Sequence, residues 1–292
     1  MNKILIIGPF PEPISGVSLA NKVVKEVLEN SNDFQILEIN TSYPIFEDAI
    51  GRFSFKKLIF FLKINFKFTM IFNSDIVYIT PGQTFFGILK YSFFILLSSV
   101  LGKELIIHVH GNYLGTQYNK LQGIKKKTFH FLISKFTKGI VLSKSLMTNL
   151  TPFISHKRIH ILNNFAEDYL IDHSQQHQPD KLHICYLSNL MEEKGIFYLL
   201  EALQGLEKRN IPYIAKIAGN IDEEIKGEIL KKINNLKNTT YLGLVYKGDK
   251  KELLNWSTIF VLPTFYKMEG QPISIIEALA TGNVIITTNH AG

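Results

Sequence analysis

Two carboxylates stand eight positions apart near the end of the chain, in the string EGQPISIIEALATG that runs from position 269 to position 282. Pro272 fits the first turn of a helix, because proline has no amide hydrogen to leave unsatisfied there. Gly282 suits the position just after a helix, where left-handed backbone is common. The string therefore predicts a helix that begins near Pro272, with the first glutamate before it and the second inside it.

The two glutamates, Glu269 and Glu277, would then reach different parts of one ligand. Glu269 and the amides of Gly270 and Gln271 would lie at the positive end of the helix dipole, where anions are favoured. One carboxylate can hold sugar hydroxyls and the other a ribose, while the amides face a diphosphate, so the pattern suits a nucleotide sugar. The structural alternative is a solvated acidic turn followed by an ordinary amphipathic helix.

The composition is that of a folded, globular protein, since 46% of the 292 residues are hydrophobic and 20% are charged. This length predicts two domains. The net charge of +7 indicates an anionic partner, which could be nucleic acid, a phosphorylated ligand or a membrane surface. The single cysteine, Cys185, allows no intrachain disulfide, favours a reducing cytosol and is expected to be a buried core thiol.

Short apolar runs alternate with longer helical patterns along the chain, which predicts parallel sheets flanked by helices. A polar stretch separates two series of these runs. We therefore expect an α/β domain over 1–171, a linker over 172–180 and a second α/β domain over 181–292, with ligands at the carboxyl ends of the strands. The expected strands are Lys3–Ile7, Phe34–Ile39, Ile76–Thr80, Glu104–Val109, Gly139–Leu142, Arg158–Leu162, Leu182–Leu187, Tyr213–Ala218, Thr239–Leu242, Ile259–Leu262 and Asn283–Thr287.

The string EGQPISIIEALATG, placed after the apolar segment TIFVLPT, resembles the Glu-x7-Glu signature of retaining glycosyltransferases of sequence family 4. The resemblance covers essentially the whole chain and implies the GT-B fold, in which two Rossmann-like, doubly wound domains face a cleft. It implies that Glu269 orients the donor sugar and that Glu277 holds the ribose. In the family a further strand and helices follow this region, so the second domain is expected to be incomplete.

The first loop, GPFPEPISGVS, follows the first expected strand and precedes a helical run. It lacks the dinucleotide fingerprint G-x-G-x-x-G, because its glycines are eight positions apart, and Glu38 is therefore discounted as a ribose-binding acid. Ser15 is expected to cap the helix. The resemblance implies that Gly16 borders the donor phosphates and the acceptor, while a purely structural turn is the equal alternative.

A strand ending in HVHGN places His108 and His110 on one face, because side chains alternate along a strand. A histidine pair in a strand is more often structural, and metal ligation would need ligands that the sequence does not offer. In the resembled family a histidine before glycine at this strand end faces the donor sugar. His110 matches that position and is expected to contact the substrate.

The second domain opens with SNLMEEKG, which resembles the Gly-Arg-Leu-x-x-Glu-Lys-Gly motif of the family. Lys194 matches the lysine that neutralises the donor diphosphate, whereas Asn189 stands where the family has arginine, so one of two expected cations is missing. Gly219 resembles the family's turn beside the nucleotide. The backbone of Leu244 and Val245, after a Tyr-Leu-Gly element, is expected to hold the base.

Two segments of the first half are unusually apolar. Phe55–Phe72 carries Lys56, Lys63 and Lys67 on one face of a helix, amid many aromatic residues. It could lie on an anionic membrane surface or could be a surface helix with its apolar side in the core. Phe85–Leu101 is only marginally long enough to span a membrane and contains a lysine, so a buried crossover helix is expected.

Together the resemblance and the residues predict a metal-independent, retaining hexosyltransferase without a cofactor. It would use a nucleotide-sugar donor, UDP-sugar before GDP-sugar, and would act in surface polysaccharide synthesis. The acceptor would be a glycan or a lipid-linked glycan, met in the cytoplasm at the inner membrane face, and nucleic acid is not an expected partner. The alternatives are a non-catalytic subunit that kept the fold, and a nucleotide-sugar epimerase or hydrolase.

Overall fold

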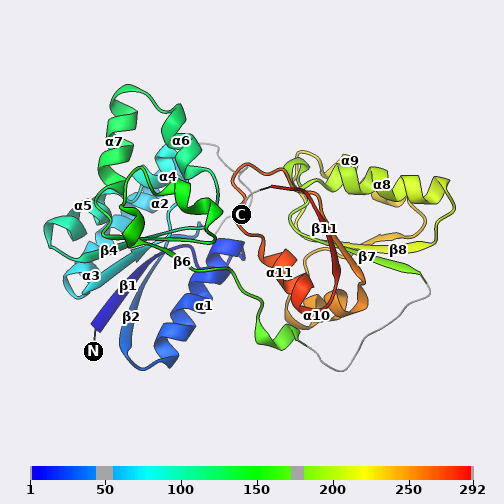
Figure 1. Ribbon diagram of the computed structural model, residues 1–292, viewed down its shortest axis with the longest axis horizontal. Coiled ribbons are helices and arrows are strands. Elements are labelled where there is room, and N and C mark those ends of the chain that lie inside the picture. Colours follow the sequence, from blue (N-terminus) through cyan, green and yellow to red (C-terminus); the bar gives the residue numbers. More distant parts are fainter. Residues whose placement is uncertain (1, 44–54, 172–180, 291–292) are drawn as a thin grey trace. The chain divides into compact units, whose positions relative to one another are not determined.

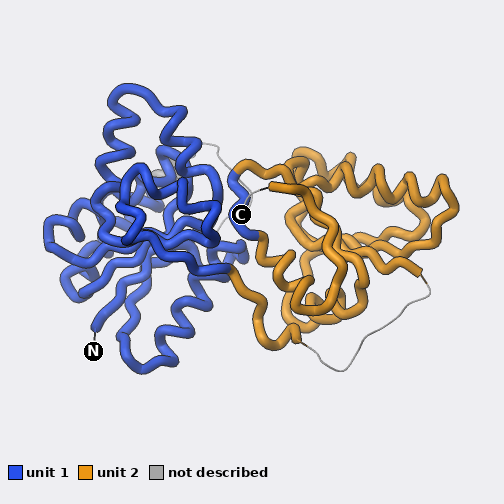
Figure 2. The backbone as a smooth tube through the Cα atoms, in the orientation of Figure 1, with its two compact units in different colours: residues 1–163, 268–271, 291–292 blue, residues 164–267, 272–290 orange. Residues whose placement is uncertain are grey.

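The computed structural model describes residues 2–43, 55–171 and 181–290, which form two compact units. Unit 1 contains the chain up to Asn163 together with the segment Met268–Gln271, and unit 2 contains Asn164–Lys267 and Pro272–His290 (Figure 2). The linker expected over 172–180 lies outside the described residues.

Unit 1 is built on a parallel six-stranded sheet with the order β2-β1-β3-β4-β5-β6 (Figure 1). Its strands are short runs of Ile, Val and Leu, the residue types that pack well on a pleated surface. Both faces of such a sheet are covered by helices, so the runs are apolar without strict alternation. The strands are β1 Asn2–Gly8, β2 Phe34–Asn40, β3 Ile76–Ile79, β4 Glu104–Val109, β5 Lys138–Val141 and β6 Ile159–Ile161.

Helix α1 packs on one face of this sheet, and the remaining long helices pack on the other (Figure 1). Ile4 and Ile6 of β1 meet α1, whereas Leu5 and Ile7 face the larger core under the other helices. Alternation along β1 therefore divides the unit into two apolar layers. The helices are α1 Gly16–Asn30, α2 Phe55–Asn65, α3 Thr69–Phe72, α4 Phe85–Leu89, α5 Ser92–Val100, α6 Leu114–Lys120 and α7 Gly123–Ile133, with the 3-10 turns η1 Phe66–Phe68, η2 Ser145–Asn149 and η3 His156–Arg158.

Unit 2 has a parallel five-stranded sheet with the order β11-β10-β7-β8-β9. Helices α8 and α9 cover one face, and α10 and α11 cover the other (Figure 1). The strands are β7 Leu182–Leu187, β8 Tyr213–Ala218, β9 Thr239–Tyr241, β10 Ile259–Leu262 and β11 Val284–Thr287. The helices are α8 Ile196–Lys208, α9 Lys226–Asn234, α10 Lys247–Trp256 and α11 Ile273–Ala280, with the 3-10 turns η4 Asp168–Leu170 and η5 Glu192–Lys194.

The predicted fold class is confirmed, because all eleven expected strands form and they make two parallel sheets with helices on both faces. Cys185 is a buried free cysteine, and burial raises the pKa of its thiol to about 12. Its expected place in the core is therefore confirmed as well.

The two apolar segments differ from their predictions. Phe55–Phe72 is not one helix but the succession α2, η1 and α3. Phe85–Leu101 does cross between β3 and β4, yet it is divided into α4 and α5 at Lys90 and Tyr91 and is not fully buried. Among the described helices, none combines the length and the apolar character needed to cross a bilayer.

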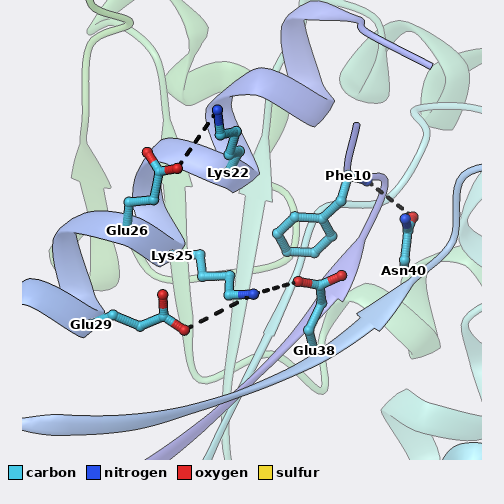
Figure 3. A network of polar contacts seen from close by, with 7 residues as sticks. All are labelled: Phe10, Lys22, Lys25, Glu26, Glu29, Glu38 and Asn40. Carbon is cyan, nitrogen blue, oxygen red and sulfur yellow. Dashed lines mark hydrogen bonds and ion pairs between the residues drawn. The ribbon is translucent and has the colours of Figure 1, made fainter. Parts of the chain in front are cut away.

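Glu38 on β2 has a structural partner in α1 (Figure 3). Lys25 Nζ lies 2.9 Å from Glu38 Oε2, and this hydrogen bond is the main reason why the pKa of Lys25 is raised. Nearby, the Phe10 amide donates to Asn40 Oδ1 at 3.1 Å, which ties the first loop to the end of β2. The Glu38 carboxylate is thus engaged in joining α1 to the sheet.

Candidate functional site

The sheet of unit 2 changes direction between β7 and β10, because the chain adds β8 and β9 on one side of β7 and then places β10 on the other. In an open parallel sheet, ligands bind outside the carboxyl ends of the strands at such a switch point. The loops that follow β7 and β10 carry Lys194 and the start of α11, respectively. The topology therefore brings these two predicted elements to the same edge of unit 2.

The two loops are packed against each other by their backbones. The Phe265 amide donates to the Glu193 carbonyl at 2.8 Å. Gly195 has a positive φ of 78°, and a Cβ there would stand 2.1 Å from the Pro263 carbonyl oxygen. Only glycine fits this close approach, which explains the Lys-Gly pair in the motif. Lys194 closes η5, and its Nζ lies 5.3 Å from the centroid of the Tyr266 ring.

The loops after β7, β8 and β9 form a continuous edge. Gly219 has φ of 140°, and a Cβ there would stand 1.8 Å from the Ser188 carbonyl oxygen. The Gly219 amide donates to the Gly243 carbonyl at 2.8 Å, so the segment before Leu244 is held beside it. Asn189 is exposed at the same edge, and its backbone carbonyl accepts a hydrogen bond from Tyr186 Oη at 3.0 Å.

Leu244 and Val245 follow β9 in different environments. Leu244 is exposed, whereas Val245 is half-buried and packs against the core of unit 2. Neither residue lies in a helix or strand, so their backbone groups are outside the sheet ladder. The structure thus places Asn189, Gly219 and this pair at neighbouring strand ends.

Helix α11 begins and ends as its sequence predicts. Pro272 occupies the N-cap position, and Ile273 is the first helical residue. At the other end Gly282 has φ of 82°, and its amide donates to the Leu279 carbonyl at 3.0 Å. The predicted helix is confirmed, and it fixes Glu277 in its second turn.

Glu277 is buried and ion-paired. Its Oε1 lies 2.5 Å from Lys250 Nζ, which comes from α10, and Lys250 also lies 3.4 Å from Glu167 Oε2. The ammonium stands 5.6 Å from the centroid of the Tyr169 ring. The predicted ribose-binding carboxylate therefore has a cation of the same unit beside it.

Burial and pairing act in opposite directions on this carboxylate. Burial raises the pKa of Glu277, and the attraction of Lys250 partly offsets that rise. Burial is the largest single influence on Lys250 and would lower its pKa, but the charge and hydrogen bond of Glu277, together with Tyr169, outweigh it and the pKa is raised. Since a buried charge without a partner costs several kcal/mol, each group depends on the other to stay ionised.

In unit 1 the segment Met268–Gln271 lies against the end of β4. A Cβ at Gly270 would stand 2.4 Å from the His110 carbonyl oxygen, and one at Gly111 would stand 2.2 Å from the Met268 carbonyl oxygen. The side chain of Gln83 joins the two loops, because its Oε1 accepts from the Tyr113 amide at 2.6 Å and its Nε2 donates to the Met268 carbonyl at 3.2 Å.

Within unit 1 this packing brings together Glu269, Gly270, Gln271 and His110, which the sequence separates by about 160 positions. Glu269 is itself buried. Gly16, the other predicted site residue of this unit, is the first residue of α1 and follows the confirmed cap Ser15.

His110 belongs to a buried aromatic cluster at the end of β4. The imidazole rings of His108 and His110 have centroids 3.9 Å apart, and Tyr78 Oη hydrogen bonds to His108 Nδ1. The Nε2 atoms of both histidines are buried and have no hydrogen-bond partner among the described residues. Burial lowers the pKa of His110 to about 4 and the pKa of His108 well below 6.5, so both rings are neutral at pH 7.

Two site residues, Gln83 and Lys250, escaped the sequence analysis. Gln83 lies in the loop after β3 and has no neighbouring polar pattern. Lys250 is one of several lysines around α10, and nothing in its spacing separates it from its solvated neighbours. Only the position of Lys250 facing Glu277 reveals its role.

Metal ligands are not gathered anywhere in 2–43, 55–171 or 181–290. No group of three or more His, Cys, Asp or Glu side chains there could hold an ion. The adjacent imidazoles of His108 and His110 have Tyr78 as their polar neighbour instead of a carboxylate.

The neutral histidine pair should make unit 1 sensitive to acid. The unfolded chain takes up protons near pH 6.5, while folded His110 takes one up only near pH 4. Stability present above pH 6.5 is therefore lost as the pH falls, by up to about 3 kcal/mol from His110 alone. In urea unfolding from pH 7.5 to pH 4, the circular dichroism transition of unit 1 should lose less stability in His110→Phe than in the unsubstituted chain.

Trp256, the single tryptophan, lies in unit 2, so its fluorescence reports that unit separately. An equal dependence on pH in both proteins would show that the histidine does not titrate as described.

Replacing Lys250 by Met should leave Glu277 buried without its cation. The folded state then holds the Glu277 proton more tightly than the unfolded state, in which the pKa of this carboxyl is near 4.5. Stability is consequently lost as the pH rises above 4.5, and the deficit of Lys250→Met should widen from pH 5 to pH 8, where it reaches about 3 kcal/mol. Urea unfolding followed by Trp256 fluorescence measures it.

The control is Lys231→Met, which changes an exposed lysine of α9 in the same unit. It should cost little at any pH. A deficit in Lys250→Met that does not change between pH 5 and pH 8 would contradict the ionised pair.

Known proteins resemble this chain both in sequence and in fold. Residues 170–292 match the sequence profile of the family described as glycosyl transferases group 1. The putative colanic acid biosynthesis glycosyltransferase WcaL of Escherichia coli is 27% identical over 116 residues, which are 38% of this chain and 29% of WcaL. The amylovoran biosynthesis glycosyltransferase AmsK of Erwinia amylovora is 29% identical over 121 residues, or 40% of this chain and 29% of AmsK.

Among solved structures, a glycosyltransferase from Rickettsia africae is similar with a TM-score of 0.69 and 17% identity, covering 100% of this chain and 80% of that one. The Anabaena protein Alr3699/HepE, crystallised in complex with UDP, gives a TM-score of 0.65 and 14% identity, covering 99% of this chain and 81% of that one. Residues 170–292 therefore carry the sequence pattern of group 1 glycosyltransferases, and the chain has the two Rossmann-like domains of the GT-B fold.

Proposed function

We propose that this protein is a glycosyltransferase of sequence family 4 that transfers a hexose from a nucleotide sugar, UDP-sugar before GDP-sugar, with retention of configuration. The observation that carries the proposal is the edge of unit 2, where the loop that carries Lys194 packs against the loop that leads from β10 to α11, at the switch point of the sheet. The match of residues 170–292 to group 1 glycosyltransferases supports it. The complexes of HepE with UDP and with UDP-glucose support UDP as the nucleotide.

Each residue then has a role that follows from its chemistry. Lys194 neutralises the leaving diphosphate, where the largest charge develops, because fixed charges stabilise a transition state most at that point. Glu269 and His110 contact the donor sugar, and the amides of Gly270 and Gln271 assist. The neutral His110 ring can exchange hydrogen bonds with a sugar hydroxyl without adding a positive charge.

The nucleoside is held by the other predicted residues of unit 2. Glu277 accepts hydrogen bonds from the ribose hydroxyls, with Lys250 keeping the carboxylate ionised in its buried position. The turn at Gly219 and the backbone of Leu244 and Val245 hold the base. Because Asn189 stands where the family has arginine, Lys194 is the cation of this motif that faces the diphosphate. Turnover should therefore depend most on Lys194.

The reaction needs no metal ion in this proposal, because Lys194 supplies the charge that a cation would provide. The acceptor is a glycan or a lipid-linked glycan of surface polysaccharide synthesis. WcaL and AmsK carry names from colanic acid and amylovoran biosynthesis, which supports that substrate class. The protein would work in the cytoplasm, at the inner membrane face.

Donor class is tested by thermal shift with UDP, GDP, ADP and NAD. UDP should stabilise the chain, by about 2.7 kcal/mol at a concentration one hundred times its dissociation constant. Glu277→Gln should remove most of the shift, whereas Glu252→Gln, an exposed glutamate of α10, should keep it. Stabilisation by NAD alone, or by no nucleotide, would contradict the proposal.

Lys194→Ala should lower turnover about 100-fold, because it removes a preorganised charge from the leaving group. Transfer of labelled sugar from UDP-hexose to a lipid-linked glycan extract measures the effect, with Lys208→Ala, an exposed lysine of α8, as the matched control. Near-normal turnover in Lys194→Ala would remove this residue from the mechanism. Donor binding without turnover in the unsubstituted chain would favour the non-catalytic subunit instead.

A further inference from the structure

Helix α2 and the following turn expose an apolar stripe to solvent. Ile59, Leu62 and Phe66 follow one another at helical spacing, and Lys63 falls between them. Phe66 is 77% exposed, whereas Ile64 on the opposite side is buried in the core of unit 1. Residues at i, i+3 and i+7 lie on one side of a helix, so the outward side of α2 is apolar as well as the inward side.

Helix α5 repeats this pattern independently. Phe93, Leu96 and Val100 are spaced i, i+3 and i+7 and are all exposed, with Val100 at 84%. Phe94 and Ile95 on the inward side are buried. A helix on the surface of a globular protein normally exposes polar residues to solvent, whereas α5 exposes apolar ones.

Direct contacts join the two stripes into one surface. The rings of Phe68 and Phe93 have centroids 5.6 Å apart, and those of Phe68 and Phe72 have centroids 6.4 Å apart. Lys103 Nζ lies 3.5 Å from the Phe72 carbonyl oxygen, and α3 packs against α5. We call this surface the aromatic face; it comprises Leu62, Phe66, Phe72, Phe93, Leu96 and Val100.

The charge around the aromatic face is mainly positive. Between positions 59 and 103 the sequence contains Lys63, Lys67, Lys90 and Lys103 but a single acid, Asp75. The Asp75 carboxylate accepts from the Lys3 amide at 2.8 Å, so it is engaged at the start of β1. Lys63 and Lys67 are exposed and form no ion pair with a carboxylate of the described residues.

Exposed phenylalanines bordered by lysines fit an anionic bilayer, above all where the lysines, like Lys63 and Lys67, pair with no described carboxylate. Aromatic rings enter the boundary between headgroups and acyl chains, while lysine side chains extend to the phosphates. Each lysine near such a surface strengthens binding, and added salt weakens its contribution. A second copy of the chain fits less well, since two aromatic faces would bring like charges together.

We propose that the aromatic face docks this protein onto the surface of an anionic phospholipid membrane. The surface extends over α2, α3 and α5, so it is wider than the single segment 55–72 that the sequence suggested. Docking deepens the proposed function, because it would bring the enzyme to a lipid-linked acceptor. The binding itself does not involve any residue of the donor site.

The test is sedimentation of the complete chain with vesicles of phosphatidylcholine alone or with 30% phosphatidylglycerol. The chain should bind the anionic vesicles at least tenfold more tightly than the neutral ones, and added salt should weaken this binding. Phe66→Ser combined with Val100→Ser should reduce the binding at least tenfold, and so should Lys63→Glu combined with Lys67→Glu. All four side chains are exposed, so the folded state should tolerate these changes.

The matched control is Val27→Ser, which changes a valine of α1 that is 62% exposed on the other face of the sheet. It should leave vesicle binding unchanged. Equal binding by the control and by the variants of the aromatic face would overturn the proposal. The proposal would also be overturned if sedimentation velocity showed a dimer that those variants abolish, because a second copy of the chain would then cover the aromatic face.

The UDP thermal shift, measured on the same variants, separates the two proposals. The variants of the aromatic face should still be stabilised by UDP but should no longer bind the anionic vesicles. If the unsubstituted chain binds anionic vesicles and shows no shift with any nucleotide, the donor proposal fails and the docking proposal stands. If it shows the shift and does not bind vesicles, only the docking proposal fails.

Discussion

In a parallel sheet every strand ends at the same edge, and the predicted chemistry of both units depends on this constraint. Loops that are far apart in sequence are forced together there, as with the loops after β7 and β10 in unit 2. Glycine then decides how closely they pack. At Gly195 and Gly270 a Cβ would collide with a carbonyl oxygen of the neighbouring loop, so backbone contacts, more than side chains, shape these edges.

Two ion pairs of similar length differ in how far they are buried. Lys25 and Glu38 join α1 to β2 in a partly solvated place, and such a pair contributes little to stability. Lys250 and Glu277 are similarly close, yet the Glu277 side chain is almost fully removed from water. Taking that carboxylate out of water is costly, and the cost is acceptable only with a cation beside it. A carboxylate held ionised in this way remains a strong hydrogen-bond acceptor at the edge where ligands are expected.

The helices α2 and α5 of unit 1 carry apolar residues on their solvent side as well as on their core side. Their inward residues, such as Ile64 and Ile95, fill a core as expected, but their outward residues are apolar too. Exposed apolar area of this extent is not needed for folding and weakens solubility. Beside it, Lys63 and Lys67 pair with no carboxylate in the described part of the chain, which fits the docking surface proposed above, whereas the layer formed by α1 has paired charges such as Lys22 and Glu26.

The sequence by itself determined the eleven strands, because short apolar runs have few alternatives, and it determined the ends of α11 through Pro272 and Gly282. It also pointed to Lys194 and the two glutamates as candidates, although their roles rest on resemblance. Only the tertiary structure decided that Lys250 faces Glu277 and that Gln83 holds the segment beginning at Met268. These contacts join residues 27 and 185 positions apart, and packing between distant segments leaves no local pattern. The outward side of α5 was hidden for the same reason, since a helix that is apolar all round does not reveal which side meets the core.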